Sequence, residues 1–244
     1  MIELCGITDV GLVRKENQDA YGVRELECGL AVCVVCDGMG GAAGGKLASR
    51  IAVDTFLEEL EKRLRPDMDA EAQKQASAEA VALANAAIRD TAGQSPQYSG
   101  MGTTLVSAVI REGEAVVSNV GDSRAYHISQ DGIRRITKDH SLVERMVDRG
   151  DITAEEARRH PNRNLITRAL GPDIDPECDC YTCQLSPGDF LLLCTDGLVN
   201  TVTDQEIMAE VLRGDTETCM DRLLAISKGR GAPDNVTVVL AREP

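Results

Sequence analysis

The sequence predicts an α+β fold in which sheets and helices occupy separate layers. Strand-like segments between 102 and 137 follow one another with short turns, which indicates antiparallel meanders. Two long helical patterns, at 45–64 and 70–91, also follow each other directly, and this order does not fit a repeating strand–helix–strand alternation. The chain shows no linker, repeat or charged tail, so we expect residues 1–244 to form a single domain.

Short apolar runs rich in β-branched residues predict the strands. The clearest runs are 30–36, 102–110, 115–120, 189–195 and 236–241, and weaker ones are 2–8, 124–129, 133–137 and 178–184. The second long helix is so rich in alanine that it is expected to pack closely against a neighbour. Later helices are predicted to begin at Thr153 and Thr203, because Glu156 and Glu206 complete a capping-box pattern three residues on.

Composition narrows the class of protein. Hydrophobic residues make up 43% of the chain but aromatic residues only 2%, so the core must be mainly aliphatic. The formal charge of -14 argues against nucleic acid and anionic membrane surfaces as partners. The chain has no signal-peptide pattern at its start and no run of about 20 apolar residues that could cross a bilayer. We expect a cytoplasmic monomer with reduced cysteines and no membrane insertion.

Aspartates stand where predicted strands begin or end. Asp37, Asp122 and Asp196 each come just after a strand-like run, and Asp234 comes just before one. Carboxylates at strand ends can converge on one rim of a sheet, where Mg²⁺ or Mn²⁺ finds oxygen ligands. A single Asp-Gly after a strand is usually only a turn, because glycine adopts positive φ. Spacing alone therefore leaves both a metal site and a set of turns open.

The glycine-rich stretch 37–46 (DGMGGAAGGK) fits two nucleotide-binding patterns imperfectly. A dinucleotide fingerprint requires the next strand and its acidic residue to follow the helix, but a second helix is predicted there. A P-loop requires Ser or Thr after Lys46, and the residue is Leu47. A plain turn into a helix also remains open, although it does not explain so many glycines.

Other phosphate chemistries and metal sites find little support in the sequence. No cysteine is followed six positions later by arginine, and no Asp-x-Asp-x-Thr motif follows a strand, which excludes cysteine- and aspartyl-nucleophile phosphatases. The three histidines leave a Ser–His–Asp triad open, but no Gly-x-Ser-x-Gly elbow supports it. In a strand, Cys178 and Cys180 face one way and Cys183 the other, so a shared soft-metal site is disfavoured and a structural role is expected.

Short motifs are spread over almost the whole chain. They are RKENQD at 14–19, DGMGG at 37–41, GTT at 102–104, NVGDSR at 119–124, DHS at 139–141, TRALG at 167–171, CTDG at 194–197 and DN at 234–235. Taken together and in this order, the motifs resemble the metal-dependent protein phosphatase family (PPM, protein phosphatase type 2C-like), especially its compact bacterial members.

The resemblance implies a four-layer α-β-β-α sandwich with two central antiparallel sheets. It also implies that Asp37 bridges two Mn²⁺ or Mg²⁺ ions, with the Gly38 carbonyl on one and Asp196 and Asp234 on the other. Asp122, with Asp196, corresponds to a third metal position described in bacterial members. By the same resemblance, Arg14 holds the substrate phosphate and Asp19 orients a metal-bound water.

The activity implied is hydrolysis of phosphoserine and phosphothreonine in phosphorylated proteins by a metal-bridging hydroxide, opposing a bacterial Ser/Thr kinase. Two departures from the family's animal members bear on this mechanism. Met39 replaces a histidine proposed there as general acid, which leaves the proton donor open, and Gln18 replaces a glutamate that contacts metal. Residues 142–163 correspond to the variable flap of the family, either a mobile surface facing substrate or a plain solvated helix pair.

Two alternatives come from other classes of protein. A catalytically silent module of the same fold would bind phosphoproteins without metal, which the intact Asp37, Asp196 and Asp234 argue against. A P-loop nucleotide hydrolase would bind ATP in a manner that depends on Lys46.

Overall fold

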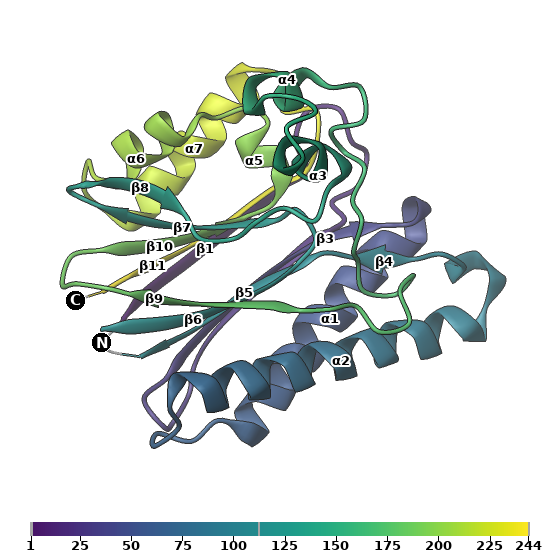
Figure 1. The fold of residues 1–244 in the computed structure, drawn as a ribbon, viewed down its shortest axis with the longest axis horizontal. Coiled ribbons are helices and arrows are strands. Elements are labelled where there is room, and N and C mark those ends of the chain that lie inside the picture. The colour runs from purple at the N-terminus through teal and green to yellow at the C-terminus, as the bar shows by residue number, and fades with distance from the viewer. Residues whose placement is uncertain (1, 112, 244) are drawn as a thin grey trace.

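The computed structural model describes residues 2–111 and 113–243, so the predicted domain limits 1 and 244 themselves lie outside the described residues. Figure 1 shows two sheets stacked face to face at the centre of the molecule. The long helices α1 (Gly41–Arg63) and α2 (Ala70–Gln94) cover one outer face, and a group of shorter helices covers the other. The predicted four-layer sandwich is therefore confirmed.

The first sheet has the strand order β2-β3-β5-β6-β9, with β4 paired to β3. Its strands are β2 (Asp19–Glu25), β3 (Ala31–Met39), β4 (Gly102–Thr103), β5 (Leu105–Arg111), β6 (Glu114–Val120) and β9 (Asp179–Gln184). The second sheet has the order β1-β11-β10-β7-β8. Its strands are β1 (Glu3–Asp9), β11 (Val236–Arg242), β10 (Phe190–Cys194), β7 (Arg124–Ser129) and β8 (Gly132–Arg135). All these pairings are antiparallel.

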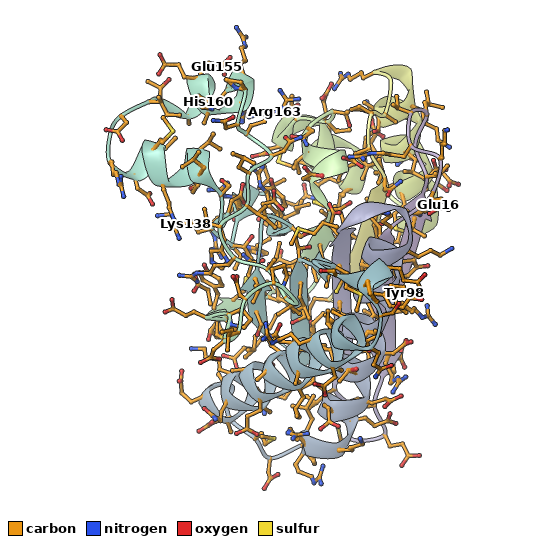
Figure 2. The ribbon with its side chains drawn as sticks, turned by 90° about the vertical axis from the view of Figure 1, so that its right-hand side faces the viewer. Glu16, Tyr98, Lys138, Glu155, His160 and Arg163 are labelled. Atoms are coloured by element: carbon orange, nitrogen blue, oxygen red, sulfur yellow. The ribbon has the colours of Figure 1, made fainter. Side chains whose placement is uncertain are left out.

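The remaining helices are short. The 3-10 turn η1 (Pro96–Tyr98) follows α2, and α5 (Asp196–Val199), α6 (Asp204–Val211) and α7 (Thr216–Gly229) lie over the second sheet. Helices α3 (Leu142–Asp148) and α4 (Ala154–Arg159) form a separate flap, which stands away from the body in Figure 2 where Glu155, His160 and Arg163 are labelled.

Three apolar layers hold the four structural layers together. One lies between α1, α2 and the first sheet, where Ala76, Ala80 and Ala84 allow the alanine-rich helix to pack closely. Another fills the space between the sheets, and the third lies between the second sheet and α5–α7. Nearly all of these side chains are aliphatic, as the composition predicted, and burying each large one contributes about 1.5–3 kcal/mol.

Most of the predicted elements are confirmed, with shifts of a few residues at their ends. The run 102–110 is not one strand, because Thr104 interrupts it to hydrogen-bond Asp37 through both its backbone and its hydroxyl. Strand β2 and helix α7 were not predicted. The capping boxes at Thr153 and Thr203 are both present. Among the described residues, no helix has the length and apolar character needed to cross a membrane.

Candidate active site

Strand direction brings the predicted aspartates to one rim of the sandwich. Strand β5 is antiparallel to both β3 and β6, so β3 and β6 run in the same direction and end on the same side. In the other sheet, β10 ends beside the start of β11. The rim holds a cleft of about 520 Å³. Its lining includes every predicted metal ligand and the predicted phosphate-binding residue: Arg14, Asp37, Gly38, Asp122, Asp196 and Asp234.

Hydrogen bonds to the backbone of Asp37 hold this residue in place, and Asp37 lines the cleft. Its N–H donates to Thr104 Oγ1 at 2.9 Å, and its carbonyl accepts from Thr103 Oγ1 and Thr104 N, both at 2.9 Å. Thr104 Oγ1 also lies 2.7 Å from Ser123 Oγ. Because Ser123 adjoins Asp122, the same threonine ties two of the predicted ligands together.

Hydrogen bonds also hold the carboxylates of Asp196 and Asp234. Asn200 Nδ2 donates to Asp196 Oδ2 at 3.0 Å, and the backbone N–H of Asn235 donates to Asp234 Oδ1 at 2.9 Å. The guanidinium of Arg14 lies 2.8 Å from Asp234 Oδ2 and remains 56% exposed, so it can reach an anion that enters the cleft.

Asp19 does not line the cleft but lies buried behind its floor, opposite Asp37 in the β2–β3 register. Its Oδ2 accepts hydrogen bonds from Thr195 Oγ1 at 2.9 Å and Thr237 Oγ1 at 2.7 Å. Its Oδ1 is buried and has no hydrogen-bond partner. A buried carboxylate oxygen without a partner is costly, which indicates that a bound group normally completes it.

The cleft floor concentrates negative charge in a poorly solvated place. Desolvation raises the pKa of Asp19 to about 7, with further increases from the charges of Asp196 and Asp234. Desolvation, followed by the charges of neighbouring carboxylates, also raises the pKa values of Asp37, Asp122 and Asp196. A divalent cation would remove this repulsion and favour the ionised form of every member.

Glycine is required at two of these positions by close packing. A Cβ on Gly38 would lie 2.2 Å from the carbonyl oxygen of Gly45 and 2.5 Å from that of Gln18. A Cβ on Gly197 would lie 1.9 Å from the carbonyl oxygen of Asn235. The glycine-rich stretch therefore lets α1 start directly against the acidic rim of the cleft. Neither nucleotide pattern is realised, because α2 follows α1 directly and Lys46 is not among the residues that line the cleft.

The donor set fits a hard divalent cation held by few protein ligands. In the described part of the chain, no three His, Cys, Asp or Glu side chains converge on a single point. A pair of neighbouring ions does not require such a point, since one carboxylate can be shared and water completes each coordination shell. Carboxylates around an open cleft, with the unpartnered Asp19 oxygen behind them, suit this arrangement.

Sequence reasoning gave no role to several residues that shape the cleft. Asn235 Oδ1 accepts from Gln18 N, and Asn235 Nδ2 donates to the carbonyls of Val10 and Glu16, so this side chain fixes the loop that carries Arg14. In the sequence, only the position of Asn235 next to Asp234 could have indicated this role. Asn164 and Ile166, which follow the flap, also line the cleft, and no local pattern marks them.

Comparison with known proteins decides the family. The family model described as Protein phosphatase 2C matches residues 13–229. The chain belongs to this family. It is 37% identical over 235 residues to the serine/threonine phosphatase stp of Listeria innocua, which covers 96% of this chain and 92% of that protein. It is 36% identical to the serine/threonine protein phosphatase PstP of Mycobacterium tuberculosis, covering 96% of this chain and 43% of that longer protein.

Solved structures of the protein phosphatase 2C family agree with the fold. A serine/threonine phosphatase of Staphylococcus aureus superposes with a TM-score of 0.93 at 36% identity, covering 99% of this chain and 95% of that one. The chain is thus a serine/threonine protein phosphatase, and family membership implies dependence on a divalent cation. Met39 lines the cleft, and no histidine of the described chain does.

Proposed function

We propose that residues 1–244 form one catalytic domain in which Asp37, the Gly38 carbonyl, Asp196 and Asp234 hold two Mn²⁺ or Mg²⁺ ions. Asp122, with Asp196, holds a third. The observation that carries this proposal is the single cleft that all five residues line, with the unpartnered Oδ1 of Asp19 behind it. When bound, the ions would lower the pKa of water in the cleft and neutralise charge that develops on the phosphoryl group.

The protein's own residues then position the reactants. Arg14 binds the phosphate of a phosphoserine or phosphothreonine through its planar guanidinium, exchanging Asp234 for the substrate. Asp19 accepts a hydrogen bond at Oδ1 from the attacking water and orients it, while Thr195 and Thr237 hold Oδ2 in place. The described lining of the cleft contains no histidine, so we assign protonation of the leaving oxygen to water.

The physiological setting follows from the substrate class. We propose that the enzyme acts as a cytoplasmic monomer on phosphorylated proteins and opposes a Ser/Thr kinase. All nine cysteines are free thiols, which suits a reducing compartment. Asn164 and Ile166, which follow the flap (residues 142–163), line the cleft, so the flap would face the bound phosphoprotein.

Hydrolysis of a phosphothreonine peptide tests the assignment. We expect turnover that requires Mn²⁺ or Mg²⁺, disappears with EDTA and is lost in Asp196→Asn. Calorimetric titration with Mn²⁺ gives the number of ions, and the Asp122→Asn variant should lose the weakest one. A chain that binds phosphopeptide without turnover at saturating Mn²⁺ would instead be a silent binding module, and the proposal would be wrong.

A further inference from the structure

Two cysteines lie next to each other at an edge of the first sheet, away from the acidic cleft. Cys178 immediately precedes β9, the edge strand, and Cys180 lies within it. Because they are two residues apart along extended chain, both side chains point to the same face. Cys180 Sγ lies 3.5 Å from Ser118 Oγ on the neighbouring strand, and Cys178 Sγ lies 3.8 Å from the carbonyl oxygen of Asp179. Both side chains are only partly buried. Cys183, in contrast, points into the core between the sheets, so the predicted division of faces is confirmed.

The pKa of Cys180 departs from those of the core thiols in the opposite direction. Burial raises the pKa of Cys33 to about 12 and that of Cys219 to about 11. The neighbouring Cys178 thiol instead lowers the pKa of Cys180 to about 6, with smaller contributions from Ser118 and the ammonium of Lys74, and the same pairing raises the pKa of Cys178. A partly exposed thiolate is the reactive form of cysteine toward oxidants.

The residue between the two cysteines contacts the flap side of the active site. Asp179 Oδ2 lies 3.1 Å from His140 Nε2, and Asp179 Oδ1 accepts from Arg168 Nη1 at 2.8 Å. His140 Nδ1 in turn accepts from the backbone N–H of Gly121 at 3.0 Å, and the His140 N–H donates to the Gly121 carbonyl at 2.9 Å. Gly121 directly precedes Asp122, so Asp179 braces the loop of that cleft residue.

The same brace supports the start of the flap. Ser141, next to His140, caps α3 by accepting from the backbone N–H of Glu144. The carbonyl of His140 accepts from the N–H of Thr167, on the chain segment that returns from the flap. The position of Asp179 therefore influences both ends of the flap through His140.

A bond between the two sulfurs would disturb this position. Extended chain places residues i and i+2 roughly 6.6 Å apart. Their Cβ atoms are separated by about the same distance, because both point to one face, whereas a disulfide needs Cβ atoms about 3.5–4.5 Å apart. A Cys178–Cys180 disulfide therefore requires the backbone to shorten at Asp179, and an edge strand can do so more easily than a central one.

We propose that Cys178 and Cys180 form a peroxide-reactive modification site whose oxidation displaces Asp179, loosens the Asp122 loop and the flap, and lowers phosphatase activity. The Cys180 sulfur attacks hydrogen peroxide, the O–O bond breaks, and a sulfenic acid and water form. The Cys178 sulfur then displaces the sulfenic oxygen as a second water, leaving a disulfide. The two thiols supply both electrons and both protons. The loss of activity rests on the proposed role of Asp122, but the oxidation itself does not.

Mapping the modified thiols tests the chemistry. The whole protein, freed of metal with EDTA, is treated with one equivalent of hydrogen peroxide, alkylated with N-ethylmaleimide and digested for mass spectrometry. We expect a Cys178–Cys180 disulfide, formed at least about tenfold faster than oxidation of Cys28, another partly buried cysteine. The Cys28→Ser variant should behave like wild type, and Cys180→Ser should lose the fast reaction. Equal reactivity of Cys180 and Cys28 would overturn the proposal.

Two further measurements test the link to the cleft. After peroxide is removed, we expect trypsin to cleave within 142–163 several-fold faster, and activity with Mn²⁺ to fall several-fold. Dithiothreitol should restore both, and Cys178→Ser should show neither change. A disulfide that forms while flap cleavage and activity stay unchanged refutes the link through Asp179. If even the reduced enzyme shows no turnover, the proposed function fails, but the mass and cleavage results still decide the redox proposal.

Discussion

Carboxylates of the cleft floor lie next to one another, whereas charges of the flap lie at the surface in pairs of opposite sign. Desolvation and like charge raise the pKa values of Asp37 and Asp196. In the flap, Glu155 and Arg159 lie 2.9 Å apart with side chains 64% and 83% exposed. Such an exposed pair contributes only about 0–1 kcal/mol. The floor is therefore destabilised until a cation binds, and the flap is weakly held in any state.

Removing one negative charge from the cleft floor should give the largest effect, because it relieves the repulsion between the carboxylates and also removes a proposed metal ligand. For Asp37→Asn we expect activity with Mn²⁺ to fall on the order of a hundredfold to a thousandfold, because a shared ligand is lost. In EDTA the same variant should be more stable than wild type, by about 1 kcal/mol or more, since like-charge repulsion is relieved. Steady-state kinetics and thermal unfolding measure the two effects.

The matched control is Asp67→Asn, an exposed aspartate in the turn between α1 and α2. It should change neither quantity. A metal-free Asp37→Asn protein that is less stable than wild type would show that the carboxylate contributes to folding and does not oppose it.

The second largest effect should be the pH dependence of stability, which is expected to come from the cleft floor. Asp19 has a folded-state pKa of about 7, above the ordinary value of 3.8 for aspartate. The folded metal-free protein thus binds more protons than the unfolded chain between these values, and its stability falls as pH rises through this range. We expect Asp19 to make the unfolding temperature in EDTA decrease from about pH 5 to pH 7.

Saturating Mn²⁺ should abolish that decrease, and Asp19→Asn should reduce it. Glu156 of the flap acts outside this window, because hydrogen bonds with Thr153 lower its pKa. If metal-free stability instead rises between pH 5 and 7, the floor carboxylates are not desolvated as described.

The sequence predicted the cleft better than the elements around it, for physical reasons. Asp37 and Asp196 follow apolar strands and precede glycines that close packing requires, so both chemistry and packing mark them. Strand β2 was missed because Gly22, with no side chain, leaves room for Leu57 and Val53, and this weakens the apolar alternation. The brace from Asp179 to His140 joins distant segments, and no local pattern could indicate it.

The substrate-facing side of the cleft should respond less than its floor. Arg14→Lys keeps the positive charge but loses the planar set of donors. We expect KM for a phosphothreonine peptide to rise about tenfold, with kcat changed less, because the guanidinium binds phosphate in the ground state as well as in the transition state. Lys15→Ala, on the same wall of the cleft, is the control and should have the smaller effect. An equal rise in KM for both variants would show that the phosphate is attracted by the positive charge of this wall as a whole and not by the planar guanidinium of Arg14.

The smallest effect is expected for the capping box, which occurs both in the flap helix α4 and in the core helix α6. Thr153 and Thr203 make the same capping box, but α4 has no buried residue, whereas α6 buries Ile207 and Val211 in the core. Replacing either threonine by alanine costs its helix about 1 kcal/mol. In Thr203→Ala the loss should appear in global unfolding, because α6 unfolds with the body. In Thr153→Ala it should appear only as faster tryptic cleavage at Arg158 or Arg159, with the unfolding temperature unchanged, because a weakly held flap opens on its own. Equal shifts of the unfolding temperature in the two variants would show that the flap is part of the cooperative core, and the contrast with the cleft floor would then lie in charge alone.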